Sequence, residues 1–510
     1  MNEAMVETTN PQVKRTPSRL TYSDLITGFL EQYYLHLVLT LATLIWFIAP
    51  KELKFSDPAE YLLLANDLGN ILNWDMNYPF EHRLSLLGIQ WMSLELFGIG
   101  KLGMFLPQFL LFAGVLMVIG MSCQTLLGKT FAFIIAFAMF PYTLDIFPDL
   151  GAAVFMFFTV LLLAKAQGTR DGVLASVCMM IAFLFKMTAY YLAIPIVLVL
   201  CFDAIRRELN RFHFAFLLTS IGLGICYLLF YQIGYGDALA RLRTASDLSD
   251  SFLWSTGDPI SLLRRLLFNP PTEFLSHYGI ALILTIIASF YLYRSNRSNR
   301  LMIAYLFGSM LLFTFGSSSL SSWQPLPFRD RMLLFAIPAF AFLSGRFVDV
   351  LMTRQLVDTV VRLLLLSSLT LIAHNSFSEV LKKVARPILS NREQVRLEII
   401  QERNLSVILA EHQTQRFLRI YTDFNQSIGE RLQVCPDLSV LQSPKKYAYL
   451  IDREKAAFQS SAYGKEDCTA ELEQFIVEQN ITVLVDNAEL LYARNFNSRE
   501  PPSTTREENP

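Results

Sequence analysis

Charge is scarce in this sequence of 510 residues. Only 17% of its residues are charged, against about 25% in a typical soluble domain, and the formal net charge is −1. A chain without an excess of positive charge has no broad basic surface for nucleic acid, so we exclude a nucleic-acid-binding protein. Apolar residues make up 53% of the chain, a composition typical of an integral membrane protein.

Two sequence signals are also missing. Residues 1–33 are polar and contain no short apolar run with a small-residue cleavage site, so we expect a cytoplasmic tail before an uncleaved first membrane helix. The chain has no internal repeat, although many transporters are built from paired halves.

The apolar residues are grouped into runs of roughly 20, the length that a helix needs to cross a bilayer. Unbroken runs favour helices over the alternating strands of a membrane barrel. The predicted membrane helices are 34–50, 103–124, 130–144, 150–166, 172–186, 188–203, 213–233, 278–294, 300–317, 332–349 and 358–375. Residues 172–203 are too long for one crossing, and Lys186 marks the point where we divide them. The sequence thus predicts a polytopic α-helical membrane protein with about 11 transmembrane helices.

Positive charge in the short loops predicts the orientation of these helices. With a cytoplasmic N-terminus, every inside loop contains basic residues: Lys129, Lys165, Arg170, Arg206, Arg207, Arg211, Arg294, Arg297, Arg300 and Arg354. Cytoplasmic loops are enriched in Lys and Arg, and this orientation places the loops 51–102 and 234–277 outside, together with the chain after about residue 376. If residues 172–203 formed one helix, the basic loops that follow would lie outside instead.

The C-terminal part, residues 376–490, is predicted to be a small extracytoplasmic α/β domain. Short apolar runs typical of strands occupy 405–412, 416–424, 445–452 and 480–487. Residues 468–480 have the spacing of an amphipathic helix. Cys435 and Cys468 could form a disulfide in an external domain, or remain two free thiols. Residues 491–510 are polar and proline-rich, and we expect disorder there.

The loop after the first apolar run begins with "FSDPAEYLLLANDLG". Asp57 can cap a helix whose first residue is Pro58, and the apolar side of this helix would lie in the membrane interface. On this interpretation Tyr61 anchors the helix among lipid headgroups. Glu60, one turn from Asp57, is either a solvated residue or a partner that shares a proton or cation with it.

Several charged residues beside or within apolar runs have two interpretations each. Asp149 could cap the following helix or take part in catalysis. Lys186 is costly in an apolar run unless it is paired, so it either serves a function or extends to the interface. Arg331, with Arg329 beside it, could bind phosphate or anchor a helix at the interface. The loop 234–277 is long enough to cover a site, or its charges only solvate it.

Pieces of the sequence resemble the GT-C glycosyltransferases, which include the protein O-mannosyltransferases and the aminoarabinose transferases. "FSDPAEYLLLANDLG" and "MNYPFEHRLSLLGIQWMSLELFG" look like the first external loop of that family. Further along, four segments follow in the family's order: "FPDLGAAVFMFFTVLLLAKA", "VLASVCMMIAFLFKMTAYYLAIPIVLVL", "RMLLFAIPAFAFLSG" and "LEQFIVEQNITVLVDN". The resemblance covers about 34–490 and identifies 34–375 as the glycosyltransferase-like membrane domain. It departs from the family where "DP" replaces the usual "DE" after the first span.

The resemblance implies a membrane enzyme that takes a sugar from a polyprenyl-phosphate donor at the external face of a bacterial inner membrane. The acceptor is a hydroxyl of a lipid, a polysaccharide or a protein, and membrane lipids surround the site. The implied residues are Asp57 and Asp149 for catalysis, Lys186, Arg331 and Arg83 for the donor phosphate, and Glu60, Tyr61 and His82 for substrate. Because of the "DP" departure, the need for a divalent cation stays open and no metal ligand is assigned.

Two other functions would also place charges near the external face. A transporter or flippase for a lipid or small solute needs polar groups within its membrane helices. A non-catalytic component of an envelope-polysaccharide assembly has no need for Asp57, Lys186 and Arg331 together.

Overall fold

The structure is a computed structural model of the chain. It describes residues 22–49, 57–74, 80–244, 280–293, 297–315 and 334–353, then 367, 370, 373, 374 and 378, and the tail segments 406–409, 432–436, 447–452, 468–486 and 490–494. The predicted helix 358–375 therefore lies almost wholly outside the described residues, as do the turn 75–79 and Arg331. Only the first part of the predicted loop 234–277, up to residue 244, is described.

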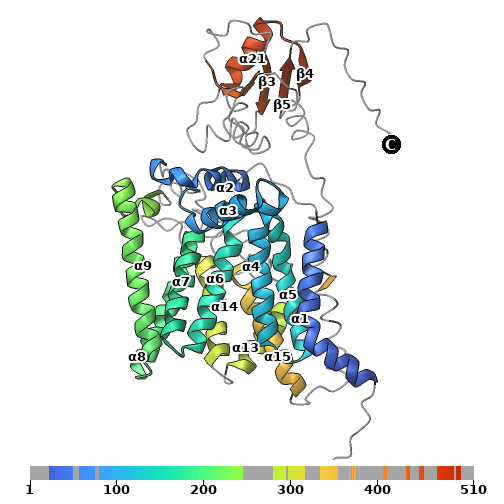
Figure 1. The fold of residues 1–510 in the computed structure, drawn as a ribbon, viewed down its shortest axis with the longest axis vertical. Coiled ribbons are helices and arrows are strands. Elements are labelled where there is room, and N and C mark those ends of the chain that lie inside the picture. The colour runs from blue at the N-terminus through green and yellow to red at the C-terminus, as the bar shows by residue number, and fades with distance from the viewer. Residues whose placement is uncertain are drawn as a thin grey trace, which may run out of the picture.

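A bundle of helices forms the main body of the molecule (Figure 1). Its helices are α1 (Tyr22–Ile48), α4 (Lys101–Ser122), α5 (Leu126–Ala136), η2 (Phe137–Leu144), α6 (Pro148–Lys165), α7 (Thr169–Phe185), η3 (Met187–Leu192), α8 (Ala193–Ile205), α9 (Arg211–Tyr235), α13 (Ile280–Leu292), α14 (Arg297–Phe315) and α15 (Ile337–Thr353). A helix is found in every predicted membrane run before residue 350. The total number of membrane crossings stays a prediction.

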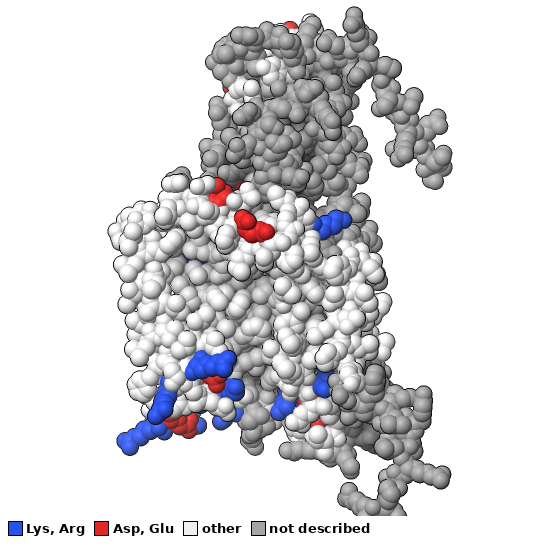
Figure 2. All heavy atoms as spheres, in the orientation of Figure 1, with Lys and Arg blue, Asp and Glu red and all other residues white. Residues whose placement is uncertain are grey.

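Several of these helices suit a bilayer by length and composition. Among the described residues, five stretches are long and apolar enough to cross a membrane: Lys101–Ser122, Leu126–Leu144, Pro148–Lys165, Met187–Ile205 and Arg211–Tyr235. The outward faces of α1 and α9 expose large apolar side chains such as Leu41, Phe47, Leu218 and Ile225. Figure 2 shows that the middle of one bundle face has scarcely any charged side chains. This apolar band fits contact with lipid tails.

The predicted break at Lys186 is confirmed. Helix α7 ends at Phe185, and Lys186 adopts an extended backbone conformation (φ −150°, ψ 125°) before η3 begins. The long apolar stretch is therefore two helical segments, as the bilayer thickness requires.

Helices α7 and α9 run side by side in the same direction and pack through small residues. A Cβ atom on Gly172, near the start of α7, would lie 2.4 Å from the carbonyl oxygen of Phe212 at the start of α9. Further along, the Ser176 and Ser220 hydroxyl oxygens are 2.8 Å apart. Near the far ends, the rings of Phe183 and Tyr227 are in edge contact with centroids 5.3 Å apart. Small residues at a membrane helix interface allow this close approach.

The two ends of the bundle differ in their connections. Helices α2 (Asp57–Asn66) and α3 (Leu84–Phe97), with the 3-10 segment η1 (Leu68–Asn73), lie across one end, which we call the covered end (Figure 1). The short connections 123–125, 166–168 and 206–210 lie at the opposite end, called the basic end. Lys and Arg side chains gather at this lower end in Figure 2.

Helix α2 is buried on more sides than its sequence pattern predicts. Glu60, Tyr61 and Leu62 are all buried, and Tyr61 has no exposed surface. The interpretation of Tyr61 as a headgroup anchor and of Glu60 as a solvated residue is therefore wrong. The physical reason is that α2 packs on α3, and Phe80, just before α3, contacts the Tyr61 ring.

The tail contains a five-stranded sheet in the order β2-β1-β3-β5-β4. Its strands are β1 (Ser406–Leu409), β2 (Leu432–Val434), β3 (Tyr447–Asp452), β4 (Val483–Asp486) and β5 (Leu490–Arg494), and helix α21 spans Thr469–Glu478. Strand β1 is parallel to β2 and β3, whereas β5 is antiparallel to β3 and β4. Leu472 and Ile476 of α21 are buried with the strand residues Ile408 and Ile451. Cys435 and Cys468 are joined by a disulfide.

Three of the four predicted strand runs contain a strand, and the predicted helix 468–480 contains α21. The fourth run, 416–424, lies outside the described residues. Strands β2 and β5 were not predicted, because each is short and lacks a long apolar run. Strand β5 extends over residues 491–494, where disorder was expected, so that expectation is wrong for these four residues.

Candidate functional site

Asp149 and Lys186 form a buried ion pair at the covered end. Lys186 Nζ donates a hydrogen bond to Asp149 Oδ1, and the two side chains are 1% and 11% exposed for Asp149 and Lys186, respectively. Asp149 follows Pro148 in the first turn of α6, and Lys186 directly follows the last residue of α7. A carboxylate at a helix N-terminus and a cation at a helix C-terminus are both favoured by the backbone dipoles. The start of α6 thus favours the negative charge of Asp149, and the end of α7 favours the positive charge of Lys186.

This pairing bears on the second of the two alternatives for Lys186, and a functional role for Lys186 stays a prediction. Its side chain bonds to Asp149 within the protein, so the interpretation of a lysine that extends to the interface is wrong. A buried charge is tolerated when it is paired, which explains how an ammonium can stand between two apolar helices.

The loop before α3 is fixed by aromatic contacts. The Tyr61 and Phe80 rings meet edge to face with centroids 5.4 Å apart, and the Arg83 guanidinium carbon lies 5.5 Å from the centroid of the Tyr61 ring. Such a cation–π contact holds a guanidinium without neutralising it. The contact places the Arg83 guanidinium beside Tyr61 of α2.

His82 is buried and connects this loop to α9. Its Nδ1 atom lies 2.9 Å from the hydroxyl oxygen of Tyr231, within hydrogen-bond distance, and the two ring centroids are 5.5 Å apart. The expectation for His82 was contact with substrate or packing beside Tyr78. The bond to Tyr231 ties the start of α3 to the outer part of α9. Substrate contact by His82 stays a prediction, and Tyr78 lies outside the described residues.

Asp57 is the first residue of α2 and is half-buried. Helix α2 packs on α3, and α3 in turn packs against α7, whose end carries Lys186. Asp57 thus stands on the same layer of helices that covers the ion pair. Its role as the catalytic base stays a prediction, and so does the phosphate contact of Arg331, which lies outside the described residues.

One functional candidate was missed by the sequence reasoning. Arg241 lies just after α9 and is only 4% exposed, although the charges of this loop were interpreted as solvated. Its Nη2 donates to the carbonyl oxygen of Phe183 at 2.7 Å, and its guanidinium carbon lies 4.5 Å from the centroid of the Phe183 ring. Burial lowers the pKa of Arg241, and the nearby tyrosines Tyr227 and Tyr231 oppose this effect. No sequence signal distinguishes Arg241 from the exposed Arg243 two residues later.

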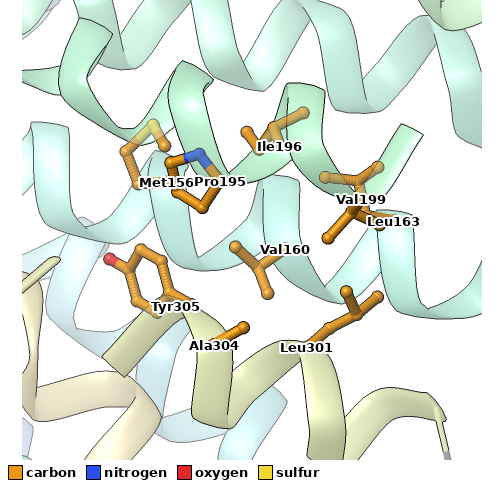
Figure 3. A pocket seen from close by; sticks show the side chains of 9 residues that line it. All are labelled: Met156, Val160, Leu163, Pro195, Ile196, Val199, Leu301, Ala304 and Tyr305. Atoms are coloured by element: carbon orange, nitrogen blue, oxygen red, sulfur yellow. The ribbon is translucent and has the colours of Figure 1, made fainter. Parts of the chain in front are cut away.

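A hollow between α6, α8 and α14 is lined by apolar side chains (Figure 3). Its lining residues are Met156, Val160, Leu163, Pro195, Ile196, Val199, Leu301, Ala304 and Tyr305. The hydroxyl of Tyr305 donates to the carbonyl oxygen of Phe335 at 2.8 Å. Tyr305 is the polar residue among those that line the hollow, and its hydroxyl is bonded to the Phe335 carbonyl oxygen, so the hollow is a poor place for proton transfer and the candidate site stays at the covered end.

Metal binding has no support within the described part of the chain. No group of three or more His, Cys, Asp or Glu residues there is arranged to hold a metal ion. The question of a divalent cation therefore stays open.

Comparison with solved structures identifies the fold. ArnT from Cupriavidus metallidurans bound to undecaprenyl phosphate superposes with a TM-score of 0.56 at 13% sequence identity, over 92% of this chain and 99% of that chain. The Archaeoglobus fulgidus oligosaccharyltransferase in complex with Zn and sulfate gives a TM-score of 0.49 at 11% identity, over 90% of this chain and 73% of that chain. No protein-family model matches the sequence, and no curated protein sequence matches it. The chain thus shares the fold of ArnT, the fold that the sequence resemblance predicted.

Proposed function

We propose that this protein is a membrane glycosyltransferase that moves a sugar from a polyprenyl-phosphate donor to an acceptor hydroxyl at the external membrane face. The observation that carries the proposal is the buried Asp149–Lys186 pair at the covered end of a GT-C fold. Intramembrane charges are expensive, and their default interpretation is function. The likeness to ArnT, which was solved with undecaprenyl phosphate, supports a donor of the same class.

The proposed orientation has a cytoplasmic N-terminus and an extracytoplasmic tail, in a bacterial inner membrane. The basic connections at one end of the bundle support it, because Lys and Arg are enriched in cytoplasmic loops. The Cys435–Cys468 disulfide at the other end also supports it, since disulfides persist in oxidising compartments. The domain boundaries near 34, 376 and 490 remain part of this proposal.

In the proposed reaction the acceptor oxygen attacks the anomeric carbon of the donor sugar. The new bond forms between that oxygen and the carbon, while the bond from the carbon to the phosphate oxygen breaks and its electron pair leaves with the lipid phosphate. Asp57 takes the proton of the acceptor hydroxyl, a contribution typically worth about 10²–10⁴-fold in rate. Lys186, Arg83 and Arg331 stabilise the departing phosphate by their positive charge.

Within this scheme Asp149 is a positioning residue for Lys186. An ammonium on a long side chain loses orientation unless a partner fixes it, and the Asp149 carboxylate supplies that partner. Glu60 and Tyr61 lie one turn from Asp57 on α2, and their contact with substrate is part of this proposal.

The decisive experiment uses the full-length protein in lipid nanodiscs. Undecaprenyl-phosphate-linked sugars, each radiolabelled in a different sugar, are incubated with the protein and an envelope extract that contains the natural acceptors. We expect one sugar to pass to the extract, with release of undecaprenyl phosphate. Movement of the labelled lipids between leaflets without any transfer would replace the proposal with a flippase.

A further inference from the structure

The corner between α8 and α9 at the basic end carries three arginines that are not neutralised. They are Arg206, Arg207 and Arg211, all of them exposed. None of the three forms an ion pair with a carboxylate of the described residues. Arg297 of α14 differs, because Asp203 compensates its charge. The corner between the two helices therefore keeps an excess of positive charge.

Arg207 adopts a backbone conformation that arginine rarely takes. Its φ of 59° lies in the left-handed region. The end of α8 is a Schellman motif, in which the Arg207 N–H donates to the Ala204 carbonyl oxygen at 3.0 Å and the Glu208 N–H donates to that of Asp203 at 2.9 Å. Glycine is the usual residue at this position, since a side chain is costly in left-handed backbone. An arginine held there against local preference indicates a role for its guanidinium beyond folding.

The backbone of this corner is held in place by side chains. The Asn210 side chain accepts a hydrogen bond from the Phe212 N–H at 2.9 Å and donates one to the Ala166 carbonyl oxygen at 3.1 Å. His213 Nδ1 accepts from the Asn210 N–H at 3.1 Å, and His213 Nε2 lies 3.1 Å from Asp203 Oδ2. The three arginines thus extend from a fixed turn, so the backbone loses little freedom when an anion binds.

Large apolar side chains are exposed directly beside these arginines. They are Phe202, Ile205, Leu209 and Phe214. The guanidinium carbon of Arg206 lies 4.1 Å from the centroid of the Phe202 ring. The apolar surface continues along the exposed sides of α8 and α9, which fit contact with lipid tails. A partner that suits this corner carries negative charge next to hydrocarbon chains.

We propose that the α8–α9 corner binds an anionic phospholipid of the surrounding bilayer. The phosphate accepts from the guanidinium groups, whose planar donors match its oxygens, and the acyl chains lie against the exposed apolar side chains. Basic clusters at a membrane surface attract anionic lipids. The carboxylate of the corner, Glu208, lies 3.9 Å from Arg297 and forms no ion pair with the three arginines. This lipid is not a substrate, because the corner lies at the end of the bundle opposite Asp149 and Lys186.

The binding experiment uses the full-length protein in a neutral detergent. Phosphatidylglycerol and phosphatidylcholine with the same acyl chains are added separately, and native mass spectrometry measures the dissociation constant of each lipid. We expect the wild type to bind phosphatidylglycerol at least about 10-fold more tightly than phosphatidylcholine. Arg206→Gln, Arg207→Gln and Arg211→Gln should each lose about 5-fold in affinity for phosphatidylglycerol, and the triple variant about 100-fold. The control Lys165→Gln removes an exposed cation at the same end, 3.9 Å from Asp171, and should keep this affinity.

A fourth substitution, Arg207→Gly, separates lipid binding from folding. Glycine suits the left-handed backbone, so this variant should unfold at a higher temperature than the wild type in neutral detergent. Its affinity for phosphatidylglycerol should nevertheless fall about 5-fold, because the guanidinium is gone. If Arg207 served only to end α8, the unfolding temperature would change and the lipid affinity would not.

The proposal is overturned if the triple variant binds phosphatidylglycerol like the wild type, or if the wild type does not distinguish the two lipids. Binding of a polyglutamate peptide that depends on the three arginines, without any preference for phosphatidylglycerol, would replace the lipid with an acidic protein partner. Sugar transfer plays no part in these measurements. A protein that transfers no sugar from any donor is still expected to bind phosphatidylglycerol, so failure of the proposed function is distinguishable from failure of this inference.

Discussion

The basic end and the covered end of the bundle treat buried charge in opposite ways. At the basic end, Asp203 Oδ2 lies 3.1 Å from His213 Nε2 and accepts a hydrogen bond from Arg297 Nη2 at 2.5 Å. At the covered end, Arg241 and Arg83 have no carboxylate partner among the described residues. The basic end thus pairs Asp203 with neighbouring side chains, whereas the covered end combines the Asp149–Lys186 pair with guanidinium groups that have no carboxylate partner among the described residues. Under the proposed function, the basic end holds the helices together and the chemistry takes place at the covered end.

The same contrast separates two aspartates whose carboxylates lie at the N-terminus of a helix, that of α5 for Asp349 and that of α6 for Asp149. Asp349 of α15 accepts hydrogen bonds from the Gln124 and Thr125 backbone N–H groups and from the Thr125 hydroxyl, at 2.7 to 2.8 Å. These bonds satisfy donors at the start of α5. Asp149, at the start of α6, pairs instead with the Lys186 side chain. The first aspartate closes a helix end, and the second holds a cation in place.

The largest effect on activity is expected for a substitution at the covered end. Asp57→Asn should lower the rate of sugar transfer by about 10²–10⁴-fold, because the amide cannot take the acceptor's proton. The measurement is label transfer in nanodiscs, with the thermal midpoint recorded in parallel. Asp67→Asn, an exposed change at the end of the same loop helix, serves as the control. A normal transfer rate in Asp57→Asn would remove this residue from the base role.

Next in size is the effect of breaking the Asp149–Lys186 pair. Lys186→Met leaves the Asp149 carboxylate buried without its partner, and removal of one member of a buried pair typically costs about 3–5 kcal/mol. The double variant Lys186→Met with Asp149→Leu should recover most of this stability but not the transfer activity. Unfolding in denaturant and transfer assays on both variants measure the two effects. If the double variant is active, the pair is structural.

A smaller effect is expected for the Asp349 cap at the basic end. Asp349→Ala leaves three donors at the start of α5 unsatisfied and should destabilise the protein by about 2–3 kcal/mol. Asp349→Asn retains an acceptor oxygen and should lose less. Undecaprenyl phosphate affinity should stay unchanged in both variants once they are folded. A selective loss of lipid binding would contradict the division of roles between the two ends.

The last prediction concerns the side of the membrane that each end of the bundle faces. It requires no change in the stability of the protein. Intact cells are treated with a membrane-impermeant thiol reagent before and after mild reduction. We expect Cys435 and Cys468 to react only after reduction, because the disulfide lies in the external tail. A cysteine introduced by Arg206→Cys, in the exposed connection at the basic end, should stay unlabelled in intact cells. Labelling of that cysteine from outside would reverse the proposed orientation.

Sequence reasoning recovered what depends on length and local order. The break at Lys186 could be predicted because a bilayer limits the length of a helix, and the helix positions followed from the apolar runs. The fold followed from the order of the quoted segments. Asp149 and Lys186 were each predicted as site residues from their position at the ends of apolar runs.

What the sequence could not provide were contacts between distant segments. The pairing of Asp149 with Lys186 depends on how α6 packs against α7, and the burial of Tyr61 depends on the return of the chain through Phe80. Arg241 and Arg243 occupy the same kind of local sequence, yet one is buried over Phe183 and the other is exposed. The burial of Arg241 depends on how α7 packs against α9, and this packing cannot be read from the sequence.

Gly172 makes the geometry of the covered end sensitive to the opposite end of the molecule. A side chain at this position would clash with the backbone of Phe212 and push the first turns of α7 and α9 apart. From Phe212 to Tyr231 the helix rises about 28 Å, so a small tilt at the base is amplified along this lever arm. This tilt would strain the hydrogen bond between Tyr231 and His82 and shift the start of α3. A residue with no chemistry of its own thereby sets the alignment of groups on the far side of the membrane.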